Sequence, residues 1–225
     1  MTQASPAAAE APLWPGAVAI HWRGVRLELL PERALWDPAQ RLLLLADLHL
    51  GKAEAFQASG IPIPSDGDRA NLNRLLTLAH GLRPERVIVL GDLIHNRLGL
   101  SAELRQKLAA LPELLSCPLH LVGGNHDRGS WIEQLPALAS LPCGPLWLSH
   151  EPEAAPAELL NVCGHLHPVA SLGGGADRLR LPCFALDRRQ RRLLLPAFGD
   201  LTGGHPCPAG LQRWLVAAGR VIALP

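Results

Sequence analysis

The sequence places carboxylate, amide and imidazole side chains directly after short apolar runs. The clearest case is Asp47 and His49, which follow the run Leu42–Ala46. A continuous apolar run is typical of a strand buried on both faces, and side chains two apart on an extended chain point the same way. Because an ionised carboxylate under a buried strand is costly without a positive partner, we interpret Asp47 and His49 as half of a metal site.

Later clusters of the same residue types complete a set of candidate metal ligands. In chain order the set is Asp47, His49, Asp92, Asn125, His150, His165 and His167. It contains no thiolate, which favours Mn, Fe or Zn ions over a structural thiolate zinc site. The set is too large for one ion but suits two ions that share a carboxylate, and such pairs promote in-line displacement at phosphorus. Asp92, which lies between the two groups of ligands in the sequence, is the expected bridge.

Three further residues near these ligands are candidates for substrate contact. His95 follows Asp92 in a loop that is expected to face the metals, and its alternative role is structural. Asp127 either caps a turn or fixes the orientation of an imidazole. Arg128 directly follows the Asn-His-Asp turn and is a candidate for phosphate binding.

The apolar runs predict two groups of strands. In the first half of the chain strands alternate with helices, so an α/β arrangement with its site at the carboxyl ends of the strands is expected. In the second half the connections are short, which indicates a second, mostly antiparallel sheet. The expected strands are residues 17–22, 25–30, 42–46, 87–90, 119–122, 146–149, 160–163, 182–186 and 192–195.

Two helices are expected in the first half of the chain. Ser65 and Asp68 have the spacing of a capping box, which predicts a helix from there to about His80. Ser101 opens the second helix, which is expected to stop near Pro112.

The remaining segments are predicted as a loop and a tail of one domain. Residues 52–64 contain a glycine and two prolines and are interpreted as a loop. Residues 1–15 are rich in Ala and Pro, which predicts a flexible tail without the features of a signal peptide. We expect residues 16–225 to form a single domain, and hydrophobic residues at 48% of the chain are ample for its core.

Composition limits the partners and the compartment. The net charge of +1 gives no global basic field, so any contact with nucleic acid is expected to be local. The five cysteines are an odd number without Cys-x-x-Cys spacing, which fits reduced thiols in the cytoplasm. No apolar run is long enough to span a bilayer, so no membrane partner is expected.

One block of positive charge stands out in the second half, Arg188–Arg192. We interpret it as the solvated tip of a hairpin between two strands. The alternative is a contact with a phosphate backbone.

The order of the polar motifs resembles that of a known enzyme family. Asp-x-His, Gly-Asp, Gly-Asn-His-Asp, His and Gly-His-x-His follow one another between Asp47 and His167, as in the calcineurin-like binuclear metallophosphoesterases. The segment Leu45–Phe56, the Gly60-Ile-Pro-Ile-Pro loop and the stretch Pro196–Gly204 further resemble the bacterial ligase-associated DNA damage response endonucleases. The resemblance implies a four-layer α-β-β-α sandwich, with two mixed β-sheets flanked by helices.

The resemblance also implies roles for individual residues. One ion would be held by Asp47, His49, Asp92 and His167, and the other by Asp92, Asn125, His150 and His165. His126 would act on the phosphate. Asp200 stands where a small residue or Ser is expected in this pattern, so the role of its loop is left open.

These inferences lead to an expected reaction. The enzyme is expected to be a metal-dependent phosphodiesterase, a DNA endonuclease acting on single strands in DNA repair, in which a hydroxide bridging two ions attacks phosphorus. Mn²⁺ is the expected ion, with Fe or Zn as alternatives. The resemblance implies functional association with an ATP-dependent DNA ligase and helicase-like repair proteins. The alternatives are a hydrolase of cyclic nucleotides or small phosphoesters, and a non-catalytic metal-binding scaffold.

Overall fold

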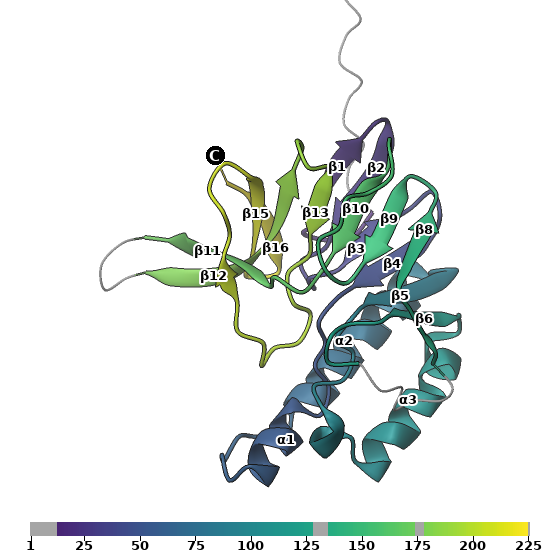
Figure 1. The fold of residues 1–225 in the computed structure, drawn as a ribbon, viewed down its shortest axis with the longest axis vertical. Helices are drawn as coiled ribbons and strands as arrows, with labels where there is room; N and C mark the ends of the chain where they lie inside the picture. Colours follow the sequence, from purple (N-terminus) through teal and green to yellow (C-terminus); the bar gives the residue numbers. More distant parts are fainter. Residues whose placement is uncertain (1–12, 128–134, 174–177, 225) are drawn as a thin grey trace, which may run out of the picture.

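Two β-sheets pack face to face, and helices cover the outer face of one of them (Figure 1). The computed structural model describes residues 13–127, 135–173 and 178–224. Every strand that the apolar runs predict is present, although β-strands also form where none was predicted.

The first sheet has seven strands, which lie across the sheet in chain order. They are β1 (Val18–Trp22), β2 (Val25–Leu29), β3 (Leu35–Asp37), β4 (Leu42–Leu45), β5 (Arg86–Leu90), β6 (Leu119–Val122) and β7 (Ala137–Leu138). Neighbours from β1 to β4 run antiparallel, and neighbours from β4 to β7 run parallel. The carboxyl ends of β4, β5 and β6 therefore lie at the same edge of the sheet.

The second sheet has nine strands. They are β8 (Ser140–Cys143), β9 (Leu146–Ser149), β10 (Leu160–Cys163), β11 (Pro168–Leu172), β12 (Leu179–Asp187), β13 (Arg192–Leu194), β14 (His205–Pro206), β15 (Gln212–Ala217) and β16 (Arg220–Ala223). β10 runs parallel to β9 and β13, and β11 runs parallel to β14. The other pairs are antiparallel, so the prediction of a mostly antiparallel sheet is confirmed.

The helices of the described residues all lie between β4 and β6. They are α1 (Lys52–Ala58), α2 (Gly67–Leu82), the short 3₁₀ helix η1 (Arg97–Gly99) and α3 (Ala102–Leu115). Leu75 and Leu78 of α2 pack in one buried cluster with Leu104 and Leu108 of α3 and with the first sheet. This contact buries the apolar stripes of both helices.

The start of the helical layer differs from the prediction. α1 occupies the predicted loop, and Gly51 precedes it with a φ of 76°, a conformation that glycine adopts without strain. The predicted capping box does not form at α2. Ser65 Oγ instead accepts a hydrogen bond from Gln57 Nε2 at 2.9 Å, and Asp68 Oδ2 accepts one from the Gly51 amide at 2.6 Å. Both side chains are therefore used for contacts with the α1 region.

The predicted ends of the two longer helices also need correction. α2 continues past His80 and ends before Arg83, which takes a left-handed conformation. Ser101 caps α3 as predicted, because its Oγ accepts a hydrogen bond from the Leu104 amide at 3.1 Å. α3 nevertheless continues through Pro112 to the buried Leu115, since packing of its last turn outweighs the one hydrogen bond that a proline cannot donate.

The leucines of β4 explain how the layers stack. Leu43 and Leu45 belong to the core between the first sheet and the helices, whereas Leu42 and Leu44 belong to the core between the two sheets. All four are fully buried. The prediction of a strand buried on both faces is therefore confirmed.

The predicted sandwich is confirmed in its two mixed sheets and in the helices over the first sheet. On the second sheet, Cys163, Ala185 and Leu194 form a small cluster that packs against Cys207 and Leu211. Within the described part of the chain, that cluster is covered by the segment around Cys207 and Leu211 and by no helix.

The first described residues contact the domain. The Leu13 amide donates to the Glu28 carboxylate at 3.1 Å, and Trp14 Nε1 donates to Glu32 Oε2 at 2.9 Å. Leu13 and Trp14, which we predicted as part of the tail, therefore have fixed contacts, and residues 1–12 lie outside the described part. No described helix is both long and apolar enough to cross a membrane.

Candidate metal centre

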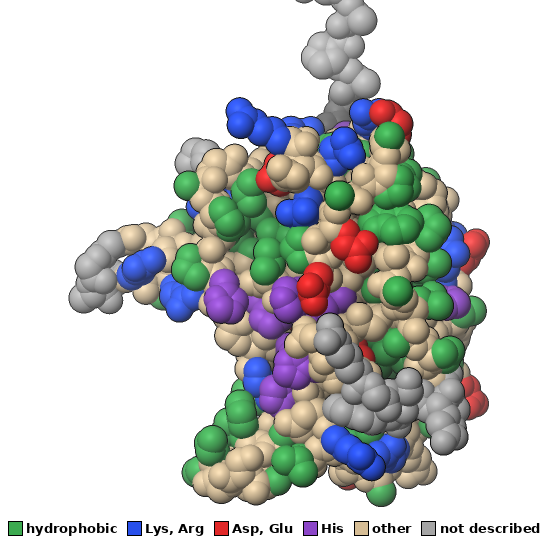
Figure 2. Space-filling model, viewed as in Figure 1, with side chains coloured by type: hydrophobic (Ala, Val, Ile, Leu, Met, Phe, Trp, Pro, Cys, Tyr) green, Lys and Arg blue, Asp and Glu red, His purple; other side chains and the backbone are tan. Residues whose placement is uncertain are grey.

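The structure brings all the candidate ligands together. Those of the first sheet follow β4, β5 and β6, and those of the second sheet follow β9 and β10. The two strand edges face each other, so histidine side chains gather in one place on the surface, between the helices and the second sheet (Figure 2).

The backbone of the ligands is not the extended chain that we assumed. Asp47, His49 and Asp92 have φ values of 58°, 48° and 51°, and His165 and His167 have values of 63° and 43°. Left-handed backbone is uncommon for residues with a side chain and is frequent at functional sites. Asp47 and His49 converge because their amides donate to the carbonyls of Gly91 and Asp92, at 3.0 and 2.9 Å, rather than by strand alternation.

One group of ligands is deeply buried. The group contains Asp47, His49, Asp92 and His167, with one candidate ligand atom from each residue within 4.8 Å of the others. His167 Nε2 lies 3.3 Å from Asp47 Oδ1, and His49 Nε2 lies 3.7 Å from Asp92 Oδ2. In the described structure both ring nitrogens of His49, and Nε2 of His167, lack a hydrogen-bond partner. Buried imidazole nitrogens without partners beside two carboxylates fit a divalent cation.

The second group of ligands is more open. Asn125 Oδ1 lies 3.0 Å from His150 Nε2 and 3.1 Å from His165 Nδ1, and the two nitrogens are 3.1 Å apart. Asp92 Oδ1 lies 3.6 Å from His150 Nε2. Asp92 therefore directs one oxygen toward each group. An amide oxygen and two imidazole nitrogens that converge with a carboxylate are also a suitable donor set for a divalent cation.

Hydrogen bonds outside these groups orient the ligands. His150 Nδ1 contacts the Leu90 carbonyl at 3.0 Å, and His167 Nδ1 contacts the Gly203 carbonyl at 3.2 Å. When each Nδ1 carries the hydrogen, each Nε2 is free to bind a metal. The His165 amide donates to Asp47 Oδ2 at 3.0 Å, which fixes that carboxylate from the second sheet.

Glycines of the motifs allow this close approach. A Cβ added at Gly91 would lie 2.0 Å from His150 Nδ1, and one at Gly124 would lie 2.2 Å from Asp92 Oδ1. A Cβ at Gly164 would lie 2.5 Å from Asp47 Oδ2. The glycines next to the ligands are therefore needed for space as well as for backbone conformation.

His126 and His95 lie beside the buried group. Their rings stack with centroids 5.1 Å apart, and the His126 ring lies 5.0 Å from that of His49. His126 Nδ1 contacts the His95 carbonyl at 2.6 Å, and the His126 amide donates to Asp92 Oδ1 at 2.9 Å. Burial, and then the charge of Lys52, lower the pKa of His95 to about 4. His95 is therefore part of the site, as a neutral ring at pH 7.

Asp127 connects two loops. Its Oδ2 accepts from the Gly124 amide at 3.0 Å, and its Oδ1 accepts from the Ile94 amide at 3.2 Å. Burial raises the pKa of this carboxyl. These contacts correspond to the turn-capping alternative, extended to the neighbouring loop. Arg128, the phosphate-binding candidate, lies outside the described residues.

Lys52 and Phe56 also border the site, although the sequence analysis assigned them no role. Lys52 Nζ lies 5.8 Å from the centre of the Phe56 ring, and Phe56 makes an edge contact with His95 at 5.8 Å. Burial lowers the pKa of Lys52, whose charge in turn lowers the pKa of His49. The two residues are one helical turn apart, a spacing that is informative only once α1 is recognised as a helix.

Asp200 has a clear structural role. Its carboxylate accepts hydrogen bonds from Arg74 Nη1 at 3.1 Å and also pairs with Arg33. The Arg74 guanidinium lies 4.4 Å from the centre of the Phe198 ring. These contacts anchor the loop that carries the Gly203 carbonyl, the hydrogen-bond partner of His167.

The Arg188–Arg192 block forms the turn between β12 and β13, as predicted. Asp187 Oδ1 accepts hydrogen bonds from the amides of Arg189 and Gln190, both at 2.9 Å. β13 runs parallel to β10, and the ligands follow the carboxyl end of β10, so this turn lies at the opposite end of the sheet from the ligands.

The sequence and fold were compared with those of known proteins. The family description of calcineurin-like phosphoesterases matches residues 40–197. Among solved structures, the nuclease MPE of Pseudomonas putida is 33% identical, with a TM-score of 0.77 over 92% of this chain and 100% of that chain. Yfce, a phosphoesterase from E. coli, is 19% identical, with a TM-score of 0.46 over 81% of this chain and 96% of that chain. A search of curated proteins found no match.

Proposed function

Because this chain belongs to the calcineurin-like phosphoesterase family, we propose that it is a metal-dependent endonuclease that cuts single-stranded DNA. The observation that carries the proposal is the convergence of two ligand groups on the two oxygens of Asp92. Similarity to a nuclease over 92% of the chain supports DNA as the substrate.

Members of this family use divalent metal ions at a binuclear site. In the proposal, one ion is held by Asp47, His49, Asp92 and His167, and the other by Asp92, Asn125, His150 and His165. When bound, such a pair supplies Lewis acidity and lowers the pKa of water.

The residues of the chain then position the phosphate and move a proton. Asn125 is exposed, and with its Oδ1 turned toward the imidazoles its amide NH₂ is free to donate to a phosphate oxygen. Contact with the His95 carbonyl orients His126 by its Nδ1, so its Nε2 is available to protonate the leaving oxygen. Asp127 keeps the loop that carries both residues in place.

Single-stranded DNA suits this site better than a duplex. The scissile phosphate must reach a centre whose ligands lie between two sheet edges, and a flexible strand can do so more easily than a stiff duplex. A net charge of +1 supplies no field for tight duplex binding through many phosphates.

The finer details belong to the same proposal. We propose Mn²⁺ as the ion because the ligands combine carboxylate, amide and imidazole groups, with Fe or Zn as alternatives. Five free cysteines in the structure support a cytoplasmic location. A role in DNA repair, in functional association with an ATP-dependent DNA ligase and helicase-like proteins, is the biological context that we propose.

Closed circular single-stranded DNA is the substrate that tests the proposal, because it has no ends. Purified protein with Mn²⁺ is expected to linearise and then degrade the circle, with much slower cutting of duplex DNA and little activity with Mg²⁺, which suits imidazole ligands poorly. Degradation of linear strands alone would make the enzyme an exonuclease. Hydrolysis of a small diester with both DNAs intact would instead identify a hydrolase of small phosphoesters.

A further inference from the structure

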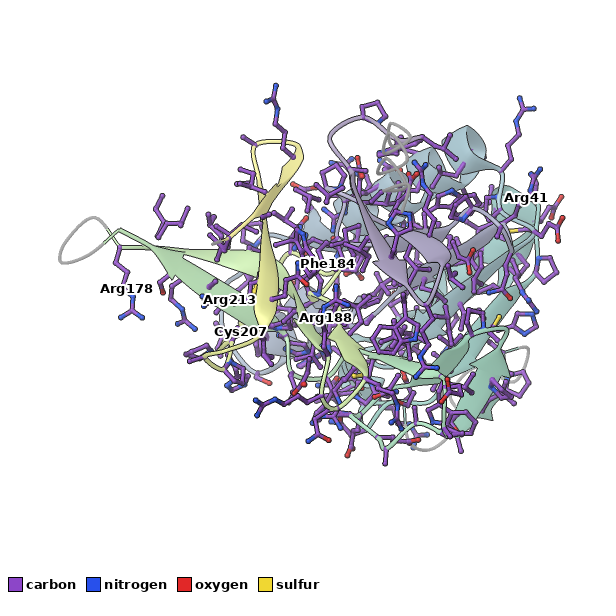
Figure 3. The ribbon with its side chains drawn as sticks, turned by 90° about the horizontal axis from the view of Figure 1, so that it is seen from above. Arg41, Arg178, Phe184, Arg188, Cys207 and Arg213 are labelled. Atoms are coloured by element: carbon purple, nitrogen blue, oxygen red, sulfur yellow. The ribbon has the colours of Figure 1, made fainter. Side chains whose placement is uncertain are left out.

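A hairpin of the second sheet projects beside the metal centre. β11 and β12 extend beyond the rest of the sheet (Figure 1), and β11 begins directly after the ligand His167. We call residues 168–173 and 178–183 the arm. Its described charged side chains are Arg178 and Arg180, and the sequence of these ranges contains no acidic residue. Figure 3 shows Arg178 far out on the arm, with its side chain directed away from the strands.

Both arginines lie on one face of the arm. They are two positions apart, roughly 7 Å along the chain, and side chains at that spacing share a face of a strand. Arg178 Nε donates to Ser171 Oγ at 3.0 Å, and Ser171 is paired with Arg180 across the hairpin. Leu172 and Leu179, which are paired with each other, lie on the opposite face.

The arginine-bearing face is turned toward the metal centre. Arg180 Nη2 donates to the Gly204 carbonyl at 2.6 Å, and the preceding carbonyl, that of Gly203, contacts the ligand His167 at 3.2 Å. Val169, which shares the face of Ser171, lies so close to Gly204 that a Cβ there would meet it at 2.1 Å. Arg180 is therefore next to the ligand loop, and Arg178 lies further out on the same face.

The other side of the centre carries the opposite charge. Glu151 follows the ligand His150 directly and is exposed, and together with Glu153 it lines a cavity of about 190 Å³ that also reaches Asn125. Figure 2 shows acidic side chains above the histidines and basic side chains on the arm. A polyanion that places one phosphate at the centre is repelled on the glutamate side and attracted on the arm side.

From this asymmetry we infer that the arm is the binding surface for the single strand, and that Arg178 and Arg180 bind phosphates next to the scissile one. The inference rests on the proposed function and adds to it the path of the DNA. The strand leaves the centre past His167 and runs outward along the arm. Local binding of this kind needs no global basic field, in agreement with the net charge of +1.

The test compares charge reversal at two ends of one strand. Arg178→Glu changes the arm, and Arg188→Glu is the matched control, because Arg188 is also exposed but lies in the turn at the far end of β12. KM for a single-stranded oligonucleotide and for a small diester is measured with each full-length variant at several salt concentrations. Arg180→Ala is included as a second arm variant.

The arm variants are expected to raise KM for the oligonucleotide relative to the small diester by roughly two- to fivefold for each lost arginine, the range for an exposed ion pair. Each should also reduce the salt dependence of binding, by about 0.7 in the logarithmic slope per phosphate contact. Arg188→Glu should change neither quantity. Equal effects of Arg178→Glu and Arg188→Glu, or no effect of the arm variants, would overturn the inference.

Two other outcomes separate the arm from the chemistry. If Arg180→Ala lowers turnover of the small diester as much as that of the oligonucleotide, Arg180 acts through the His167 loop and its assignment as a phosphate ligand is wrong. If the wild-type protein hydrolyses the small diester but leaves single-stranded DNA intact, the proposed function itself fails, and the inference fails with it.

Discussion

The two groups of candidate ligands differ in how far the protein closes them off from water. Asp47, His49 and Asp92 are only 0%, 4% and 2% exposed, whereas Asn125 is exposed and His165 is half-buried. In the buried group, imidazole nitrogens lack partners within the described structure. In the open group, by contrast, Asn125 Oδ1 lies within hydrogen-bond distance of the two imidazoles.

This difference indicates a division of work. Desolvated ligands without other partners gain most from a cation, so the buried group is expected to hold its ion more tightly. The open group presents an amide and a half-buried imidazole at the surface, where an oxygen of the substrate can reach. Asp92 belongs to both groups, which makes it the first place to test the comparison.

Removing the charge of Asp92 is expected to have the largest effect. In Asp92→Asn, one oxygen and the negative charge that both groups share are lost, so metal content should fall below two ions per chain and turnover by more than about 10³-fold. The metal-free variant should be at least as stable as the wild type, since Asp47 and Asp92 are both buried carboxylates. Elemental analysis, turnover and thermal unfolding measure these three quantities. A variant with two ions and normal turnover would show that Asp92 is no bridge.

Replacing His126 separates chemistry from metal binding. Its ring contacts the His95 carbonyl and stacks on His95, so neither ion requires it in our assignment. His126→Ala should keep both ions and slow turnover by about 10²–10⁴-fold, the range for a lost acid or charge-stabilising group. A diester whose leaving group has a low pKa should be hydrolysed with a smaller loss. A reduced metal content would instead make His126 a ligand.

The sequence was sufficient for the strands and for the identity of the residues that meet. Apolar runs such as Leu42–Leu45 report burial directly, and polar residues at their ends stand out against them. The way in which Asp47 and His49 converge could not be predicted, because their left-handed backbone depends on hydrogen bonds to Gly91 and Asp92 of the neighbouring strand.

Contacts between distant segments were the part that sequence could not supply. Asp68 has the spacing of a cap, but its carboxylate binds the Gly51 amide, which is far away in sequence. Asp200 differs from the expected motif, and only the fold reveals that Arg33 and Arg74 surround it. In both cases tertiary contact overrides a local preference.

Asp127 and Asp68 now extend the comparison to the loops, since each carboxylate accepts backbone hydrogen bonds beside one ligand group. In Asp127→Asn the amide can accept from only one of the two amides of Gly124 and Ile94, so the loop of Asn125 and His126 should loosen. We expect turnover to fall by about 10–100-fold, as for lost supports of metal ligands, while the buried ion stays bound.

The control for Asp127→Asn is Asp187→Asn. Asp187 also accepts two backbone hydrogen bonds, from Arg189 and Gln190, but in the turn at the opposite end of the second sheet. Its replacement should leave turnover and metal content unchanged. Equal losses of turnover in the two variants would mean that Asp127 acts through general stability rather than through the ligand loop.

Asp68 should give the smallest effect on turnover and a distinctive effect on stability. Burial raises the pKa of this carboxyl from 3.8 to about 6 although it accepts a hydrogen bond from Gly51. The folded state therefore favours the protonated form, and the stability that this form contributes is lost as the pH rises from about 4 to about 6. Asp68→Asn does not titrate, so its free energy of unfolding relative to that of the wild type should rise over this interval and then level off. Denaturant unfolding of metal-free protein at several pH values measures the difference. Turnover should change little, because His49 and Leu50 keep their own backbone hydrogen bonds to Asp92 and Leu93, at 2.9 Å each. A large loss of turnover in Asp68→Asn would show that the buried group depends on its loop as strongly as the open group does, and the contrast between the two groups would not hold.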